Sequence, residues 1–185
     1  MKKVLSVLVA LVLALGIQAA PRGKFIHVDT SVNKNLKPQL AFCQEHKDGQ
    51  DITTLLVQTV DVNGYKEFTD ESRVLIRFSD NQAVRLNRVP GSEIAKRKYS
   101  KKNGTATISY YETVTQYEVT PEVIEKLEAG IAIIKVRIVF KANESKDYEI
   151  AEGYQAKMAE DLLKSYREAE QNNRKANSDL SDEDF

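Results

Sequence analysis

The chain has 185 residues, and its 27 lysines and arginines are balanced by 27 aspartates and glutamates. A formal net charge of zero gives no global attraction to nucleic acid or to an anionic membrane, which argues against binding to either one through overall charge. The single cysteine, Cys43, cannot form an internal disulfide, so stability has to come from a packed core. A chain of this length is sufficient to bury one.

The first residues have the pattern of a secretory signal peptide. Two lysines follow the initiator methionine, an apolar run covers residues 4–17, and Ala19 and Ala20 follow it. The run is shorter than the roughly 20 residues of a membrane-spanning helix, and no basic stop-transfer cluster follows, which favours cleavage over an uncleaved anchor. We therefore predict a signal peptide over residues 1–19 and an exported protein, periplasmic or extracellular, with no transmembrane segment in its mature chain.

Short strands separated by turns are the pattern of the first half of the mature chain. Residues 25–28 are a candidate strand, and residues 52–62, rich in β-branched side chains, are a second that ends at the turn signal Asn63-Gly64. Apolar and polar residues alternate over 73–78 and 83–89 on either side of a polar turn. This alternation predicts a β-hairpin with one buried face.

The second half combines strands with two helices. Residues 105–119 are a long candidate strand, and Thr120-Pro121-Glu122 predicts a helix start, since it supplies a capping threonine, an N1 proline and an acid in the first turn. Residues 131–140 are a candidate buried strand. Apolar residues recur at helical spacing over 151–166, which predicts a long amphipathic helix. The acidic, aperiodic tail over 177–185 is predicted to be disordered.

This order of elements predicts a single α+β domain over residues 20–176. Strands joined by short links favour an antiparallel meander sheet of about five strands, with the long C-terminal amphipathic helix covering its apolar face. Strand order stays open, because meander and split arrangements share this pattern.

Three segments of the second half carry a resemblance: residues 117–122, 124–127 and 133–138. In these segments the chain resembles small uncharacterised exported proteins of Gram-negative gut-type bacteria, over the last third to half of its length. The resemblance implies a strand, helix, strand and terminal helix. Its motifs describe packing, so it implies no active residue.

Cys43 and His46 place a thiol and an imidazole close together in the sequence. They are weak candidates for a metal site, because they lack the second ligand pair that makes such spacing specific. As a nucleophile, Cys43 would need His27 or His46 as its base. The simpler interpretation is a small buried cysteine beside a surface histidine. We therefore predict no metal site, no cofactor and no catalytic residue.

The basic stretch between the hairpin and the long strand is the candidate contact surface. Five basic side chains surround one tyrosine in an expected loop, and they suit an anionic ligand held by charge and stacking. The candidate residues are Lys96, Arg97, Lys98, Tyr99, Lys101 and Lys102. Arg73, Arg77, Arg85 and Arg88 extend this patch if the hairpin presents them on the same side. The alternative is a solvated loop that keeps the domain soluble.

Three functions fit these observations. The leading hypothesis is a non-enzymatic binding or interaction module of the bacterial cell envelope, whose partner is an anionic envelope component or a protein. The second is a small envelope enzyme that uses Cys43 with a histidine, which requires these groups to meet in a pocket. The third is a structural or assembly subunit that uses a sheet edge or the tail.

Overall fold

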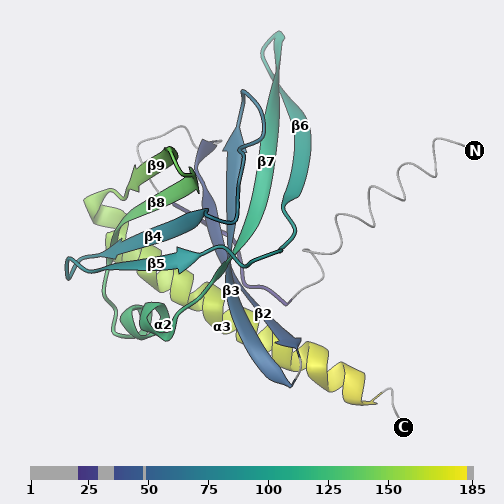
Figure 1. Cartoon of the computed structure of the whole chain (residues 1–185), viewed down its shortest axis with the longest axis vertical. Coiled ribbons are helices and arrows are strands. Elements are labelled where there is room, and N and C mark those ends of the chain that lie inside the picture. The colour runs from purple at the N-terminus through teal and green to yellow at the C-terminus, as the bar shows by residue number, and fades with distance from the viewer. Residues whose placement is uncertain (1–20, 29–35, 48, 183–185) are drawn as a thin grey trace, which may run out of the picture.

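Buried and more exposed side chains alternate over residues 73–78 and 83–87, whereas residues 40–44 and 54–57 are buried on both faces of their strands. The computed structural model describes residues 21–28, 36–47 and 49–182, so the predicted signal peptide over 1–19 lies outside the described residues. Figure 1 shows two β-sheets whose strands run in crossing directions, with one long helix beside both of them. Among the described helices, none has the length and apolar character needed to cross a membrane.

Sheet A is built from two hairpins. β2 pairs with β3, β6 pairs with β7, and β7 joins the hairpins by pairing with β3; the short β1 lies along the free side of β2. All of these pairings are antiparallel, and the strand order is β1-β2-β3-β7-β6. The strands are β1 (Ile26–His27), β2 (Gln39–Lys47), β3 (Gln50–Asp61), β6 (Ala95–Asn103) and β7 (Ala106–Glu118).

Sheet B contains the hairpin that the sequence predicted. Val74 lies opposite Leu86 and Ile76 lies opposite Val84, and all four side chains are buried. Asn81, in the turn, has a φ of 67°, a conformation that asparagine tolerates. The strand order is β5-β4-β8-β9. The strands are β4 (Arg73–Phe78), β5 (Ala83–Asn87), β8 (Ile133–Lys141) and β9 (Glu144–Glu149).

The α+β class and the antiparallel pairing are confirmed, but the strands do not form one meander. The chain leaves sheet A after β3, builds β4 and β5 of sheet B, and returns to sheet A with β6 and β7. The physical reason is burial: two sheets can each turn an apolar face to the other, whereas one layer would present more apolar surface than one helix covers.

The helices begin where the sequence predicted them. α2 (Pro121–Glu128) follows Thr120 and has proline at its start, and the short 3₁₀ helix η2 (Glu152–Tyr154) leads into α3 (Gln155–Asp182). The prediction of a disordered tail was wrong for residues 177–182, which continue α3; residues 183–185 lie outside the described residues. Helical hydrogen bonding continues through this polar sequence although no apolar stripe marks it.

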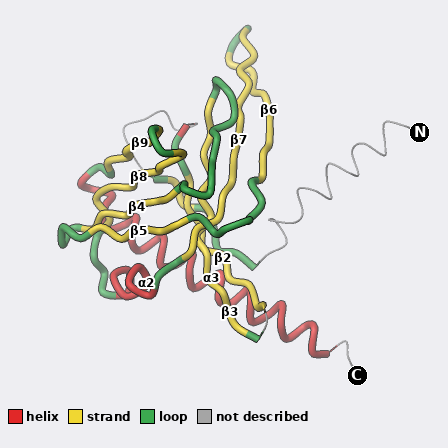
Figure 2. Tube along the Cα trace, in the orientation of Figure 1, coloured by secondary structure: helices red, strands yellow, loops and turns green. Residues whose placement is uncertain are grey.

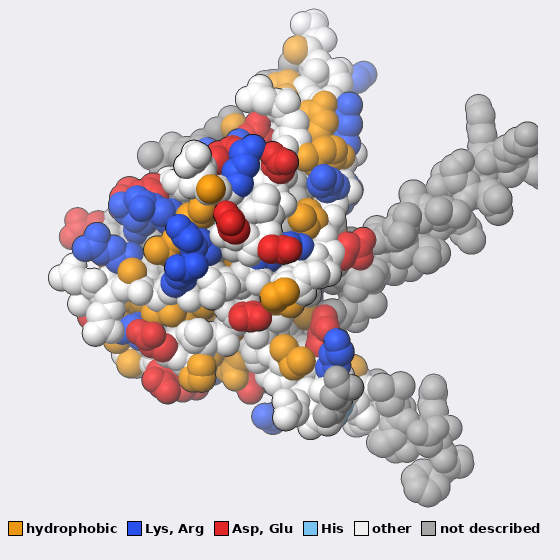
Figure 3. All heavy atoms as spheres, in the orientation of Figure 1, with side chains coloured by type: hydrophobic (Ala, Val, Ile, Leu, Met, Phe, Trp, Pro, Cys, Tyr) orange, Lys and Arg blue, Asp and Glu red, His pale blue; other side chains and the backbone are white. Residues whose placement is uncertain are grey.

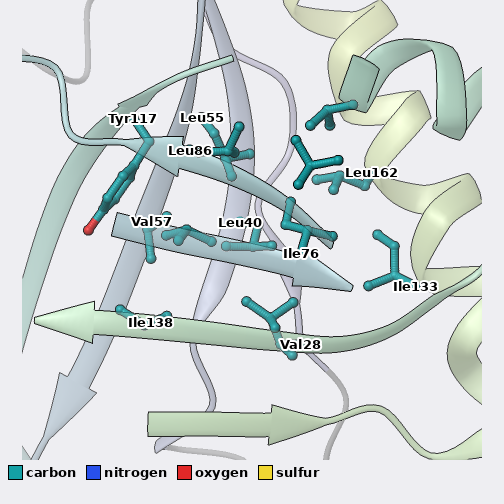
Figure 4. Close-up of a cluster of buried hydrophobic side chains, with 14 of the residues drawn as sticks. Val28, Leu40, Leu55, Val57, Ile76, Leu86, Tyr117, Ile133, Ile138 and Leu162 are labelled. Carbon is teal, nitrogen blue, oxygen red and sulfur yellow. The ribbon is translucent and has the colours of Figure 1, made fainter. Parts of the chain in front are cut away.

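Both sheets and α3 contribute to one apolar core. Figure 4 shows Leu40 and Val57 of sheet A beside Ile76 and Ile138 of sheet B, with Leu162 of α3 at the same cluster. Each side chain of this size contributes about 1.5–3 kcal/mol when fully buried. A smaller cluster, formed by Ala41, Cys43 and Leu56 with Phe25 and Val114 against it, lies on the other face of sheet A.

Helix α3 also closes the free edge of β2. The backbone N–H of Phe42 donates to Ser165 Oγ at 3.1 Å, while the carbonyl of Phe42 accepts from Gly23 at 2.9 Å. Further along α3, Asn173 Nδ2 donates to Asp51 Oδ1 at 3.0 Å, where the helix runs beside the turn between β2 and β3 (Figure 2). Sheet edges expose unpaired N–H and C=O groups, and here a helix and the segment around Gly23 cover them.

The contact between Gly23 and α3 leaves no room for a side chain. A Cβ at Gly23 would overlap the backbone carbonyl and the hydroxyl of Ser165. Gly23→Ala should therefore lower the free energy of unfolding by about 1–3 kcal/mol, because α3 has to move off the edge of β2. Urea unfolding followed by circular dichroism measures this change. Gly153→Ala is the matched control, since that position is open and should change stability by less than about 0.5 kcal/mol; equal effects would contradict the packing argument.

Candidate functional site

The predicted basic loop is a strand. Residues 95–103 form β6, which pairs with β7 along its whole length and lies at the edge of sheet A. A turn with Gly104 at a φ of 61° joins the two strands, and Figure 1 shows their hairpin projecting beyond the rest of the protein. The prediction of a loop was wrong. The strand was not recognised in the sequence because the basic run lacks the alternation of apolar and polar residues that marks most strands. Asn103 pairs with Ala106, so the turn residues are Gly104 and Thr105, and a glycine at the first turn position is the sequence signal for this hairpin.

Strand geometry divides the candidate residues between two faces of sheet A. Side chains alternate along β6, so Lys96, Lys98 and Lys102 share one face, and Arg97 and Lys101 share the other with Tyr99. A single patch of all six residues is therefore absent from this strand.

The first of these faces, which we call the lysine face, consists of Lys96, Lys98 and Lys102 with Tyr65 and Tyr111. The ammonium of Lys96 lies 5.7 Å from the centre of the Tyr65 ring, and that of Lys98 lies 5.1 Å from the centre of the Tyr111 ring. The two rings pack edge to face at 5.2 Å. Cation–π contacts of this kind hold a flexible lysine over a rigid surface.

The opposite face of β6 has a second aromatic pair. Tyr99 stacks on Tyr110, its direct partner on β7, with ring centres 5.3 Å apart. Arg97 and Lys101 each lie 5.7 Å from the Tyr99 ring. Burial raises the pKa of the Tyr99 phenol, so the hydroxyl stays protonated at neutral pH. On this face, Glu112 lies directly across from Arg97, which places a carboxylate beside the cations.

The arginines that the sequence offered as an extension do not join β6. Arg73, Arg77 and Arg85 lie on the outer face of sheet B, because their neighbours Val74, Ile76 and Leu86 point into the core. Figure 3 shows Lys and Arg side chains gathered over that sheet. Arg88 is buried and bonded to Asp70 and to the carbonyl of Ser92, so it has a structural role.

Two acidic residues of β9 balance part of the charge on sheet B. Arg137 Nη2 donates to Asp147 Oδ2 at 2.7 Å, and Lys135 binds both Asp147 and Glu149. The hydrogen bond from Arg137 holds the pKa of Asp147 at about 2, below its ordinary value of 3.8. This surface is thus partly neutralised by its own side chains.

Cys43 and the histidines lie in different environments. The Cys43 side chain is fully buried, and this burial raises the pKa of its thiol to about 12. His46, three residues further along β2, faces the other way and its Nδ1 lies 2.9 Å from Asp51 Oδ1. His27 lies on β1 opposite Gln39, four residues from Cys43 along β2. Within the described ranges, no group of three or more His, Cys, Asp or Glu residues could hold a metal ion.

The residues that accompany the lysines were missed by sequence reasoning. Tyr65 lies in an irregular segment after β3, and Tyr110 and Tyr111 gain their roles only from the β6–β7 register. No family model, no curated protein and no solved structure matches this chain. A function has to be inferred from the geometry of the chain's own residues.

The buried thiol should be unreactive in the folded protein. A pKa of about 12 leaves very little thiolate at pH 8, and the thiolate is the reactive form. We expect iodoacetamide to label Cys43 at least about a hundredfold more slowly in native buffer than in urea, as measured by mass spectrometry. Fast labelling of the folded protein would contradict this environment and would favour the hypothesis of a cysteine enzyme.

Protonation of Asp147 should contribute to acid unfolding. Because its pKa is lowered by folding, the ion pair stabilises the folded state fully above about pH 4 and loses this effect as pH falls toward 2. Asp147→Asn and Arg137→Gln should each make the urea midpoint less dependent on pH between 4 and 2. Unfolding titrations across that range provide the measurement. An unchanged pH dependence in both variants would contradict the assignment.

Proposed function

We propose that this protein is a non-enzymatic binding module that holds an extended anionic ligand, such as an acidic glycan of the cell envelope, on the lysine face of β6. The observation that carries the proposal is the pairing of Lys96 and Lys98 with the rings of Tyr65 and Tyr111. Both ammonium groups are held in place before any ligand arrives. Pre-organisation of this kind lowers the entropy that binding costs.

The lysine face suits an extended polymer that carries several charges. Residues two apart in a strand are separated by roughly 7 Å, so Lys96, Lys98 and Lys102 form a line along the edge of the sheet. Their partners across the strand pair are Thr113, Tyr111 and Thr107, and none of these carries a charge. The face therefore presents positive charge and aromatic surface together.

The carboxylates near the lysine face have other cationic partners. Asp61 lies across from Tyr111 on β3 and forms an ion pair with Lys66 at 3.4 Å. Glu67 accepts a hydrogen bond from Lys141, and this bond is the main cause of the lowered pKa of Glu67. The charge of Lys96 has a smaller effect on that pKa. Glu112 lies on the opposite side of the sheet with Arg97. The lysine face is consequently a better anion site than the face that carries Tyr99.

The other two hypotheses have less support. An enzyme would need Cys43 beside a histidine, and the buried thiol points to the opposite side of β2 from His46. An assembly subunit would add a strand to the edge at β6, but a lysine-rich edge strand opposes such pairing. Export to the periplasm or beyond, predicted from residues 1–19, would bring the module to envelope glycans, and the resemblance to exported bacterial proteins agrees with that location.

The proposal predicts that the two faces of β6 behave differently. Lys96→Ser, Lys98→Ser and Lys102→Ser combined should weaken binding of polygalacturonate and dextran sulfate about tenfold or more at 0.15 M salt, and should flatten the salt dependence. Arg97→Ser with Lys101→Ser, on the opposite face, is the matched control and should change affinity less than threefold. Replacing all five basic residues with serine should abolish binding while the fold is retained. Calorimetry measures the affinity, and circular dichroism checks the fold.

Three outcomes would contradict the proposal. Equal losses in both face variants would show only general charge attraction. Unchanged binding in the five-residue variant would place the ligand elsewhere. If the native protein binds no ligand and the five-residue variant self-associates, the lysines serve to protect the sheet edge.

A further inference from the structure

A second basic site lies at a cavity formed by segments that are far apart in the sequence. The cavity has a volume of about 640 Å³, and lysines from four parts of the chain line it: Lys24, Lys37, Lys101 and Lys157. Lys101 reaches it from β6, and Lys157 reaches it from the first turn of α3. Small-molecule sites commonly have volumes of roughly 300–1,000 Å³, so this cavity is large enough for an organic ligand.

The charges around this cavity are unequal. Asp161 is the single carboxylate among the described lining residues, and it lies 3.1 Å from the ammonium of Lys157 on the same helix. One acid thus lies among the ammonium groups of Lys24, Lys101 and Lys157. Like charges that converge on one cavity repel one another, and an anion inside it would relieve this repulsion.

The remaining walls are largely apolar. Phe25 and Ile26 contribute from the segment around β1, and the buried Met158 contributes from α3. Tyr154, which is 49% exposed, also lines the cavity. A ligand with one anionic group and an apolar body would satisfy both the lysines and these walls.

We propose that this cavity, the lysine pocket, binds an anionic amphiphile, meaning a carboxylate or phosphate attached to an alkyl or aryl body. The site differs from the lysine face, because Lys101 projects from the opposite side of β6 to Lys96, Lys98 and Lys102. The same ligand chemistry can come from a free amphiphile or from the headgroup region of a membrane lipid. The two proposals stand independently.

Calorimetry with two probes tests the lysine pocket. Dodecanoate below its micellar concentration represents the free source, and phosphatidylglycerol vesicles represent the membrane source. We expect dodecanoate to bind and uncharged dodecanol to bind at least about tenfold more weakly. Binding of vesicles alone would assign the site to lipid headgroups. Binding of neither probe would overturn the proposal.

Variants of the pocket separate this site from general hydrophobic binding. Lys24→Ser combined with Lys157→Ser should weaken dodecanoate binding about tenfold or more, because it removes two of the four cations. Asp161→Asn should strengthen binding severalfold, because it removes the one carboxylate among the described lining residues, and circular dichroism checks that the variant is folded. Unchanged affinity in the double variant, or weaker binding in Asp161→Asn, would overturn the proposal.

The variant that lacks Lys96, Lys98 and Lys102 serves as the control. It should bind dodecanoate as the native protein does, since none of these three residues lines the pocket. If it loses polygalacturonate but keeps dodecanoate, both sites are supported. If the native protein does not bind polygalacturonate and the variant still binds dodecanoate, the lysine pocket is supported and the proposed function is contradicted.

Discussion

The docking of α3 on the edge of β2 is the contact on which the rest of the structure depends. Ser165 and the segment around Gly23 supply hydrogen-bond partners to Phe42, where β1 is too short to cover the edge. The same helix places Leu162 in the core between the sheets. A helix that serves as both edge cover and core layer ties the two sheets into one body, and its first turn also forms a wall of the lysine pocket.

The two edges of sheet A are treated in opposite ways. The edge at β2 is covered by the Ser165 hydroxyl and by the backbone around Gly23, whereas no described strand pairs with the outer side of β6, which carries charge instead. Lysines along an edge discourage pairing with another strand but leave the side chains open to a ligand. Both basic sites proposed for this protein contain lysines of β6, because lysines project from both faces of this strand. The absence of a covering element there is what makes the strand available.

Local patterns in the sequence predicted the elements better than their arrangement. Alternation over residues 73–78 and the Thr120-Pro121 helix start are determined by near neighbours, and both predictions are confirmed. The division into two sheets was missed because it depends on the pairing of β3 with β7, which are more than forty residues apart in the chain. The five basic candidate residues were found by their charge, and Tyr99 was added because it lies among them. Their division between two faces and the role of Tyr65 needed the strand register and the tertiary fold.

The contact between Ser165 and Phe42 spans 123 residues of sequence, which has a consequence for the order of events during synthesis. A ribosome has to synthesise the chain as far as Ser165 before the edge of β2 can meet its cover, so the backbone N–H of Phe42 waits without this partner. Contacts of such long range slow folding and leave a nascent chain open. A fold that closes last at its C-terminal helix would therefore stay open until synthesis has passed Ser165.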